Sequence, residues 1–256
     1  MNYGICKLSI VPLRLEDSDR SEMVSQVLYG DLFELLEVSK KWSRIRLTYD
    51  SYEGWIDNKQ FVSLTKNEYD SLNQLPTKLS TNLLDIITTT TNELLPISLG
   101  SNVAVVNFLN HSFDGATNDF NFSKSTIIEI AHLYLNSPYL WGGKTPFGID
   151  CSGFIQMVYK LNGIQLPRDA NRQVTEGEAL SFIEETEAGD LAFFDNEEGV
   201  ITHVGIIMEN NQIIHAHGKV RVDHLDHSGI FNNERQMHTH KLRVIKRIVK
   251  KKLLIN

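Results

Sequence analysis

The sequence predicts an α+β fold for its second half, preceded by a small all-β barrel. Three observations predict this arrangement: residues 1–64 show strand-like alternation, two amphipathic helices begin near residues 123 and 151, and several apolar strand-like runs follow the second helix. With 256 residues, the chain is long enough for one to two domains with a substantial core.

The N-terminal β segment depends on a repeated apolar and polar alternation. Ile45, Leu47 and Tyr49 alternate with polar residues, which is the period of a half-buried strand. Residues 32–38 form a second strand candidate, and residues 30–31 supply a turn before it. Short strands at this spacing are typical of a small barrel, which we expect at residues 1–64.

The middle of the chain, residues 65–122, has a mixed pattern. Nine of the sixteen residues at 77–92 are Ser, Thr or Asn, which indicates a linker. Residues 103–108 (VAVVNF) contain three β-branched valines and a phenylalanine, and they predict a strand. We therefore expect a linker that leads into a second small β unit.

Residues 123–256 predict helices first and then a sheet. One helix should begin at Ser123 and stop before Pro138, and a second should begin at Cys151 and end at Asn162, with Gly163 as its C-terminal glycine. The strand-like runs that follow are residues 190–194, 202–208, 212–216 and 242–249.

The charge balance argues against general nucleic-acid binding. The chain has 25 basic and 32 acidic residues, a formal net charge of −7, whereas phosphate contacts require a basic surface. Residues 241–256 concentrate seven basic side chains and no acid, and they are either a solvated strand end or a site for an anionic partner.

The N-terminus and the cysteine content predict a cytoplasmic protein without a membrane partner. Cys6 and Cys151 are too few and too far apart to indicate a disulfide framework. The first twenty residues lack the pattern of a secretory signal, and no run of 18 apolar residues is present.

Cys151 is the strongest candidate for chemistry. A thiol at the N-terminus of a helix has its pKa lowered by the helix dipole, which favours the nucleophilic thiolate. A nucleophilic thiol also needs a base, and His203 and His215 lie downstream on one predicted hairpin. Each residue alone is more often structural, and Cys6 is expected in the core, but the combination favours catalysis.

The register of the hairpin decides whether the two histidines can cooperate. A two-residue loop at residues 210–211 would place His203 and His215 on opposite faces of the sheet. A three-residue loop, or a bulge, would place both on one face as diagonal neighbours. A Cys–His–His site requires the second register, which we therefore predict.

Metal or cofactor chemistry is not expected from the sequence. Histidines 215, 217, 224 and 227 are close in sequence, but their spacing matches no zinc pattern, and a second cysteine ligand is absent.

Several collinear motifs resemble a known family. Residues 138–143 (PYLWGG) and 148–154 (GIDCSGF) are followed by residues 166–169 (LPRD), 189–191 (GDL), 203–206 (HVGI) and 214–216 (IHA). This series resembles the NlpC/p60-type cysteine peptidases of bacterial cell-wall metabolism. Residues 21–26 (SEMVSQ) and 52–55 (YEGW) resemble the bacterial SH3-like (SH3b) domain that some members carry.

The resemblance implies a papain-like catalytic domain, a helix bundle plus an antiparallel sheet, at residues 123–256. It implies that Cys151 is the nucleophile, that His203 is the general base and then the acid, and that His215 orients His203. The oxyanion would be held by the Cys151 N–H and the Tyr139 hydroxyl. Tyr139 could instead be a core aromatic residue.

The resemblance also implies substrate contacts close to the nucleophile. Asp150 would bind the free amino group of an N-terminal L-alanine, and a role as helix N-cap is compatible with this. Ser152 would donate to the D-glutamyl carboxylate. Arg168 could pair with a substrate carboxylate or with Asp169, and the sequence leaves both open.

In relatives of this type, the SH3-like domain narrows the amine end of the cleft, and Glu22 and Tyr52 are the matching positions here. Both could also be ordinary surface residues. The implied reaction is hydrolysis of the γ-D-glutamyl–(meso-diaminopimelate or L-lysine) bond of stem peptides, with release of L-Ala-D-Glu in murein recycling. The alternatives are a non-catalytic muropeptide sensor and an exported wall hydrolase. The partner would be a small murein peptide; a protein partner is not indicated.

Overall fold

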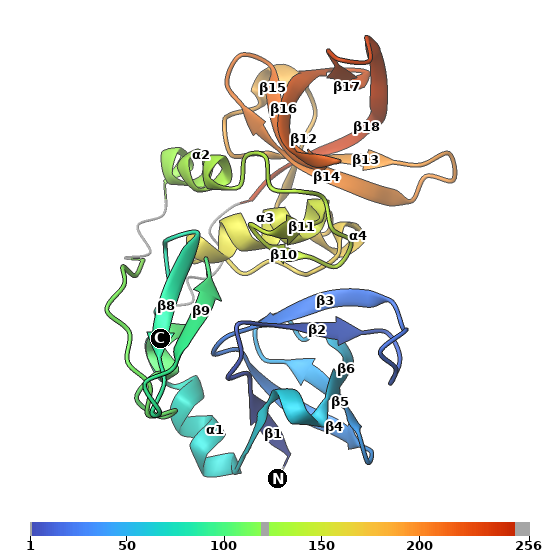
Figure 1. Cartoon of the computed structure of the whole chain (residues 1–256). Helices are drawn as coiled ribbons and strands as arrows, with labels where there is room; N and C mark the ends of the chain where they lie inside the picture. The colour runs from blue at the N-terminus through green and yellow to red at the C-terminus, as the bar shows by residue number, and fades with distance from the viewer. Residues whose placement is uncertain (1, 119–122, 249–256) are drawn as a thin grey trace. The chain divides into compact units, whose positions relative to one another are not determined.

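The computed structural model describes residues 2–118 and 123–248, which form two compact units (Figure 1). The first unit contains residues 2–118 and 141–145, and the second contains residues 123–140 and 146–248. Within the described residues, no helix has the length and apolarity needed to cross a membrane.

The first unit is built on an antiparallel sheet of seven strands, in the order β3-β2-β6-β5-β4-β1-β7. Its strands are β1 Tyr3–Ile5, β2 Ile10–Arg14, β3 Met23–Leu28, β4 Leu32–Val38, β5 Trp42–Leu47, β6 Glu53–Asp57 and β7 Val62–Leu64, with the 3-10 turn η1 Asn58–Gln60 before β7. In β5, Ile45 and Leu47 are buried between exposed arginines, as the alternation predicted. The strand ends at Leu47, so Tyr49 lies in the following turn.

Residues 66–118 pack on the same core as the first strands. The segment contains α1 Lys66–Asn73, the antiparallel pair β8 Leu84–Thr88 and β9 Leu94–Ser98, and the 3-10 turn η2 Val103–Val105; β10 Lys144–Thr145 also belongs to this unit. Ile87 and Ile97 share a buried cluster with Ile5 and Tyr29. The boundary expected after residue 122 falls at residues 119–122, outside the described residues.

Two local predictions for this segment are wrong. The strand expected at residues 103–108 is the turn η2, because the Asn102 side chain accepts from the Ala104 N–H and starts a turn. A short apolar run does not distinguish a strand from another buried segment, and Val103 is buried here without strand pairing. The linker expected at residues 77–92 contains strand β8, which pairs with β9.

The second unit combines short helices with an antiparallel sheet, as the α+β prediction requires. Its elements are α2 Lys124–Leu133, β11 Gly148–Ile149, α3 Cys151–Leu161, α4 Ala170–Gln173, β12 Glu178–Leu180, η3 Ile183–Glu185, β13 Leu191–Asp195, β14 Ile201–Met208, β15 Gln212–His217, β16 Lys219–Asp226, β17 Gly229–Asn232 and β18 Met237–Arg247. Strand β18 pairs with both β13 and β17, so the six strands β13 to β18 close into a barrel. The sequence did not predict this closure.

Helix α3 begins and ends where its residues predict. The Asp150 carboxylate accepts from the Gly153 N–H at 2.6 Å, which caps the first turn. Gly163 follows the helix with a φ of +77°, a conformation that glycine adopts at little cost. All side chains of α3 are buried, and the helix packs against β14 and β15 (Figure 1).

The hairpin of β14 and β15 has the register that a Cys–His–His site requires. Gly205 pairs with His215 and Met208 with Gln212, which leaves a three-residue loop. His203 and His215 are therefore diagonal neighbours on one face of the sheet, as predicted.

Candidate active site

Cys151 lies at the first turn of α3, against the strand that carries His203. Its side chain is buried, and the thiol donates to the Thr202 carbonyl at 3.9 Å. The backbone N–H groups of Ser152 and Val204 also act on the sulfur. Because Thr202 and Val204 flank His203, these contacts place the sulfur beside the backbone of His203.

Burial keeps Cys151 protonated in the resting site. Burial first, and the nearby Asp150 carboxylate second, raise the pKa of Cys151 from 9.0 to about 12, while Arg168 and two backbone N–H groups oppose the change. This disfavours the thiolate by roughly 4 kcal/mol, whereas a helix terminus stabilises an anion by about 0.3–2 kcal/mol. The expected lowering of the Cys151 pKa by the helix N-terminus is therefore outweighed by burial.

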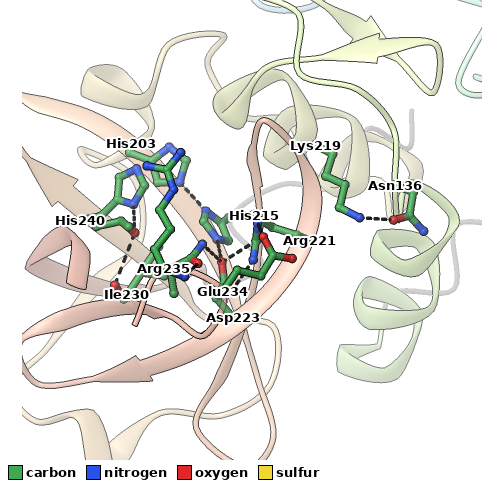
Figure 2. Close-up of polar contacts among 12 residues, drawn as sticks. Asn136, His203, His215, Lys219, Arg221, Asp223, Ile230, Glu234, Arg235 and His240 are labelled. Carbon is green, nitrogen blue, oxygen red and sulfur yellow. Dashed lines mark hydrogen bonds and ion pairs between the residues drawn. The ribbon is translucent and has the colours of Figure 1, made fainter. Parts of the chain in front are cut away.

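His203, His215 and Asp223 form a chain of hydrogen bonds (Figure 2). His215 donates from Nε2 to the Asp223 carboxylate at 3.1 Å, because an ionised carboxylate can only accept. Nδ1 of His215 then carries a lone pair and accepts from Nε2–H of His203 at 2.8 Å. This assignment follows from the network and leaves Nδ1 of His203 as its proton acceptor.

Asp223 is held as a carboxylate by its own partners. Arg221 donates from Nη2 to Oδ1 at 3.0 Å, and Asn232 lies 3.5 Å from Oδ2. Burial favours the neutral acid, but the hydrogen bonds from His215 and Arg221 outweigh it together and lower the pKa of Asp223. The sequence analysis missed Asp223. It lies diagonally across from His215 in the β15–β16 register, so the diagonal argument would have found it once that turn was placed.

His240, on β18, adds a further imidazole ring to the group around His203. Its ring stacks on that of His203 with centroids 4.1 Å apart, and the His217 ring lies 4.8 Å from His240. Burial first, and the neighbouring imidazoles second, hold the pKa of His203 well below its usual value. His203 is therefore neutral in the resting site, which is the form that can accept a proton.

Asp150, Ser152 and Arg168 form a second buried network beside the thiol. Arg168 donates to the two Asp150 carboxylate oxygens at 3.0 and 2.6 Å and to the Ser152 hydroxyl at 2.9 Å. The sequence analysis did not consider Asp150 as a partner of Arg168, and a contact of Arg168 with a substrate carboxylate stays a prediction. Asp150 is the expected N-cap, and the substrate contacts of Asp150 and Ser152 stay predictions.

Tyr139 lies within electrostatic reach of the Cys151 thiol. Burial first, then the charges of Cys151 and Asp150, raise the pKa of Tyr139 to about 12, so its hydroxyl keeps its proton. The side chain is 37% exposed and is not a core residue. A protonated, partly exposed hydroxyl is suited to donate to an oxyanion.

Glu22 and Tyr52 belong to the first unit. Glu22 accepts a hydrogen bond from Nε1 of Trp141 at 2.5 Å. Tyr52 is partly buried and packs at the edge of a hydrophobic cluster in the first unit. Tyr52 is thus not a simple surface aromatic residue. A substrate role for either residue stays a prediction.

The histidine cluster is also the group of described residues that can hold a metal ion. His203, His215 and His240 each offer one ligand atom, and these atoms lie within 4.8 Å of one another. His240 comes from a strand distant in sequence, so spacing could not reveal this set. Of the four histidines considered from the sequence, His215 belongs to this set, and histidines 217, 224 and 227 do not.

Comparison with known proteins supports the family resemblances of the N-terminal SH3-like part and of the C-terminal NlpC/P60-like part of the chain. Residues 136–241 match the NlpC/P60 family, and residues 13–61 match the bacterial dipeptidyl-peptidase SH3 domain. The structure is similar to the crystal structure of an NlpC/P60 family protein from Bacillus cereus ATCC 10987, with a TM-score of 0.78 and 19% identity, over 96% of this chain and 99% of that one. This likeness shows the fold.

Two curated relatives extend the comparison. The gamma-D-glutamyl-L-lysine dipeptidyl-peptidase of Bacillus subtilis (strain 168) is 42% identical over 92 residues, 35% of this chain and 31% of the relative. Dipeptidyl-peptidase 6 of Lysinibacillus sphaericus is 26% identical over 260 residues, 84% of this chain and 88% of the relative. The chain thus spans less than a third of the length of the Bacillus subtilis relative. It carries an NlpC/P60 domain at residues 136–241 and, before it in the sequence, a bacterial SH3 domain at residues 13–61.

Proposed function

We propose that this protein is a cysteine endopeptidase that hydrolyses the γ-D-glutamyl–diamino acid bond of cell-wall stem peptides and releases L-Ala-D-Glu. The observation that carries the proposal is the buried series Cys151, His203, His215. The Cys151 thiol contacts the carbonyl of Thr202, next to His203, and Nε2 of His203 lies 2.8 Å from Nδ1 of His215. The identity to a gamma-D-glutamyl-L-lysine dipeptidyl-peptidase over this region supports the choice of bond.

The first half-reaction follows from the protonation states of the resting site. A neutral Cys151 thiol transfers its proton to Nδ1 of His203 as the sulfur bonds to the γ-carbonyl carbon of D-glutamate. Nε2–H of His203 remains bonded to His215, and Asp223 stabilises the positive charge that spreads over the two rings. The proton then passes from His203 to the leaving amine, and a thioester remains.

The second half-reaction returns the site to its starting state. A water molecule gives a proton to Nδ1 of His203 and attacks the thioester carbonyl. The carbon–sulfur bond breaks, the dipeptide leaves, and Cys151 recovers its proton from His203. In both steps the oxyanion would accept hydrogen bonds from the Cys151 N–H and the Tyr139 hydroxyl.

A free amino terminus is the proposed specificity feature. Glu22 and Asp150 would supply negative charge for the ammonium group, with Tyr52 limiting the length of the peptide at that end. The buried Arg168 guanidinium offsets much of the Asp150 charge. Selection of a free amine suits stem peptides that have lost their sugar, and hence recycling in the cytoplasm.

A substrate panel tests this proposal. The purified protein is incubated with L-Ala-γ-D-Glu-meso-diaminopimelate, the L-lysine analogue and N-acetylated forms of both, and products are followed by mass spectrometry. We expect L-Ala-D-Glu from the free amines and a rate at least about 10-fold lower after acetylation. Glu22→Gln should reduce this discrimination, and Glu16→Gln, which changes an exposed acid of the same unit, should not.

The outcomes separate the alternatives. Binding of the peptides without cleavage would favour a muropeptide sensor. Equal cleavage of acetylated peptides or of intact wall would favour an exported hydrolase and would contradict amine selection.

A further inference from the structure

His203, His215 and His240 together can bind a metal ion, a property that peptide hydrolysis does not require. The three residues come from β14, β15 and β18, and their ligand atoms lie within 4.8 Å of one another. We propose that these three imidazoles form an inhibitory Zn²⁺ site, which switches off the proposed peptidase by capturing its general base.

The geometry is close to that of a zinc site. Tetrahedral Zn²⁺ holds imidazole nitrogens at about 2.0–2.1 Å, which places two such nitrogens about 3.4 Å apart. Nε2 of His203 and Nδ1 of His215 are 2.8 Å apart, and the His203 and His240 rings are already stacked at 4.1 Å. Because a ring nitrogen binds a metal through a lone pair in the ring plane, the stacked His240 ring must rotate about its side-chain bonds to point Nε2 at the ion. Water or His217 would then supply the fourth ligand.

Outer contacts hold two of the three rings in the required orientation. The Asp223 carboxylate accepts from Nε2 of His215, which directs the lone pair of Nδ1 towards His203. The Thr239 hydroxyl lies 2.9 Å from Nδ1 of His240, which leaves Nε2 as the ligand atom of that ring. Carboxylates and other polar groups on the far nitrogen are the usual supports of metal-binding histidines.

Inhibition follows from the position of one proton. In the resting site His203 carries its proton on Nε2, and Nδ1 is the acceptor for the Cys151 proton. Zn²⁺ binding at Nε2 requires that proton to move to Nδ1 through solvent, without net gain or loss. Nδ1 is then a donor and can no longer accept the thiol proton, so the metal blocks catalysis rather than assisting it.

Co²⁺ binding tests the site without any activity measurement. Cys151→Ala protein, which lacks the thiol as a competing ligand, is titrated with CoCl₂, and the visible d–d absorption is recorded before displacement with ZnCl₂ and then EDTA. We expect one tetrahedral Co²⁺ per chain and, in His240→Gln and His240→Phe, an affinity at least about 10-fold lower. His240→Phe keeps a stacked ring, so it separates loss of a ligand from loss of packing.

His238→Gln is the matched control, since His238 lies on the same strand but is exposed and bonded to Asp226. It should bind Co²⁺ like the Cys151→Ala parent. An unchanged affinity in both His240 variants, or the absence of stoichiometric binding, would overturn the site.

The inhibitory role rests on the proposed function and has its own readout. ZnCl₂ should inhibit peptide cleavage by the Cys151 protein, and EDTA should restore it. In His240→Gln, the ZnCl₂ concentration that halves the variant's own zinc-free rate should be at least about 10-fold higher. Binding without inhibition would refute the switch. If no peptide is cleaved at all, the Co²⁺ titration still decides the site, so the two failures are distinguishable.

Discussion

Nε2 of His203 and Nδ1 of His215 lie 2.8 Å apart. The Asp223 carboxylate, which contacts His215, decides which of the two imidazoles is the donor in this hydrogen bond. Asp223 fixes the proton of His215 on Nε2, which makes His215 an acceptor and His203 a donor through Nε2. The reactive nitrogen of His203 is thereby determined by a carboxylate that does not contact it.

Removing the acceptor at position 223 should weaken the base. Asp223→Ala frees His215 to adopt either tautomer, and we expect kcat to fall about 10- to 100-fold with little change in KM. Asp223→Asn, which keeps an oxygen acceptor but not the charge, should give a smaller loss. Asp226→Ala, on the same strand, is the control. A pH–rate profile of the Ala variant that overlays the unmodified one would show that Asp223 is only structural.

The close approach of β14 and β15 at Gly205 should be sensitive to a single methyl group. A Cβ there would lie 2.7 Å from Ile213 Cδ1 and 3.0 Å from His215 Cβ. Gly205→Ala should therefore cost about 1–3 kcal/mol of stability and lower activity by displacing His215. Urea unfolding measures the cost, and Ile213→Ala in the same chain should recover part of it. Additive losses in the double variant would contradict the contact.

The buried pair of Arg168 and Asp150 should matter more for stability than a surface pair. The pair is almost fully enclosed, with contacts of 2.6 and 3.0 Å, so Arg168→Met leaves an uncompensated carboxylate. We expect a loss of about 3–5 kcal/mol in urea unfolding. Adding Asp150→Asn should restore part of it. Arg44→Met, which breaks an exposed pair with Glu53, should cost about 1 kcal/mol or less. Equal losses would refute the argument.

The histidine cluster should make the protein sensitive to acid. Burial lowers the pKa of His203, His215 and His217, and lowers that of His240 to about 3. Since the unfolded chain binds these protons near pH 6.5, their contribution is present above about pH 6.5 and is lost as the pH falls towards the folded values. The Tm should drop between about pH 7.5 and about pH 5, and less so in His240→Gln than in His238→Gln. An identical drop in both variants would contradict this assignment.

The placement of Cys151, His203 and His215 was predictable because its signals are local. Cys151 follows a capping residue at a helix start, and His203 and His215 lie on one hairpin whose loop length sets their register. Asp150 as an N-cap and Gly163 as a helix stop follow from the same short-range rules.

The features that escaped prediction depend on distant parts of the chain. His240 reaches His203 only because β18 closes the barrel, and Arg168 reaches Asp150 across a loop. The pKa of Cys151 was misjudged because burial, a tertiary property, exceeds the effect of the helix dipole. Residues 103–108 illustrate the same limit, since β-branched residues fill a core as well in a turn as in a strand.

Dipeptide release by Cys151→Ala protein tests the central claim most directly. The variant and the unmodified protein are incubated with L-Ala-γ-D-Glu-meso-diaminopimelate, and free L-Ala-D-Glu is quantified, with circular dichroism to confirm folding. The account predicts release by the unmodified protein and only background release by the folded variant. Undiminished release by Cys151→Ala would contradict it.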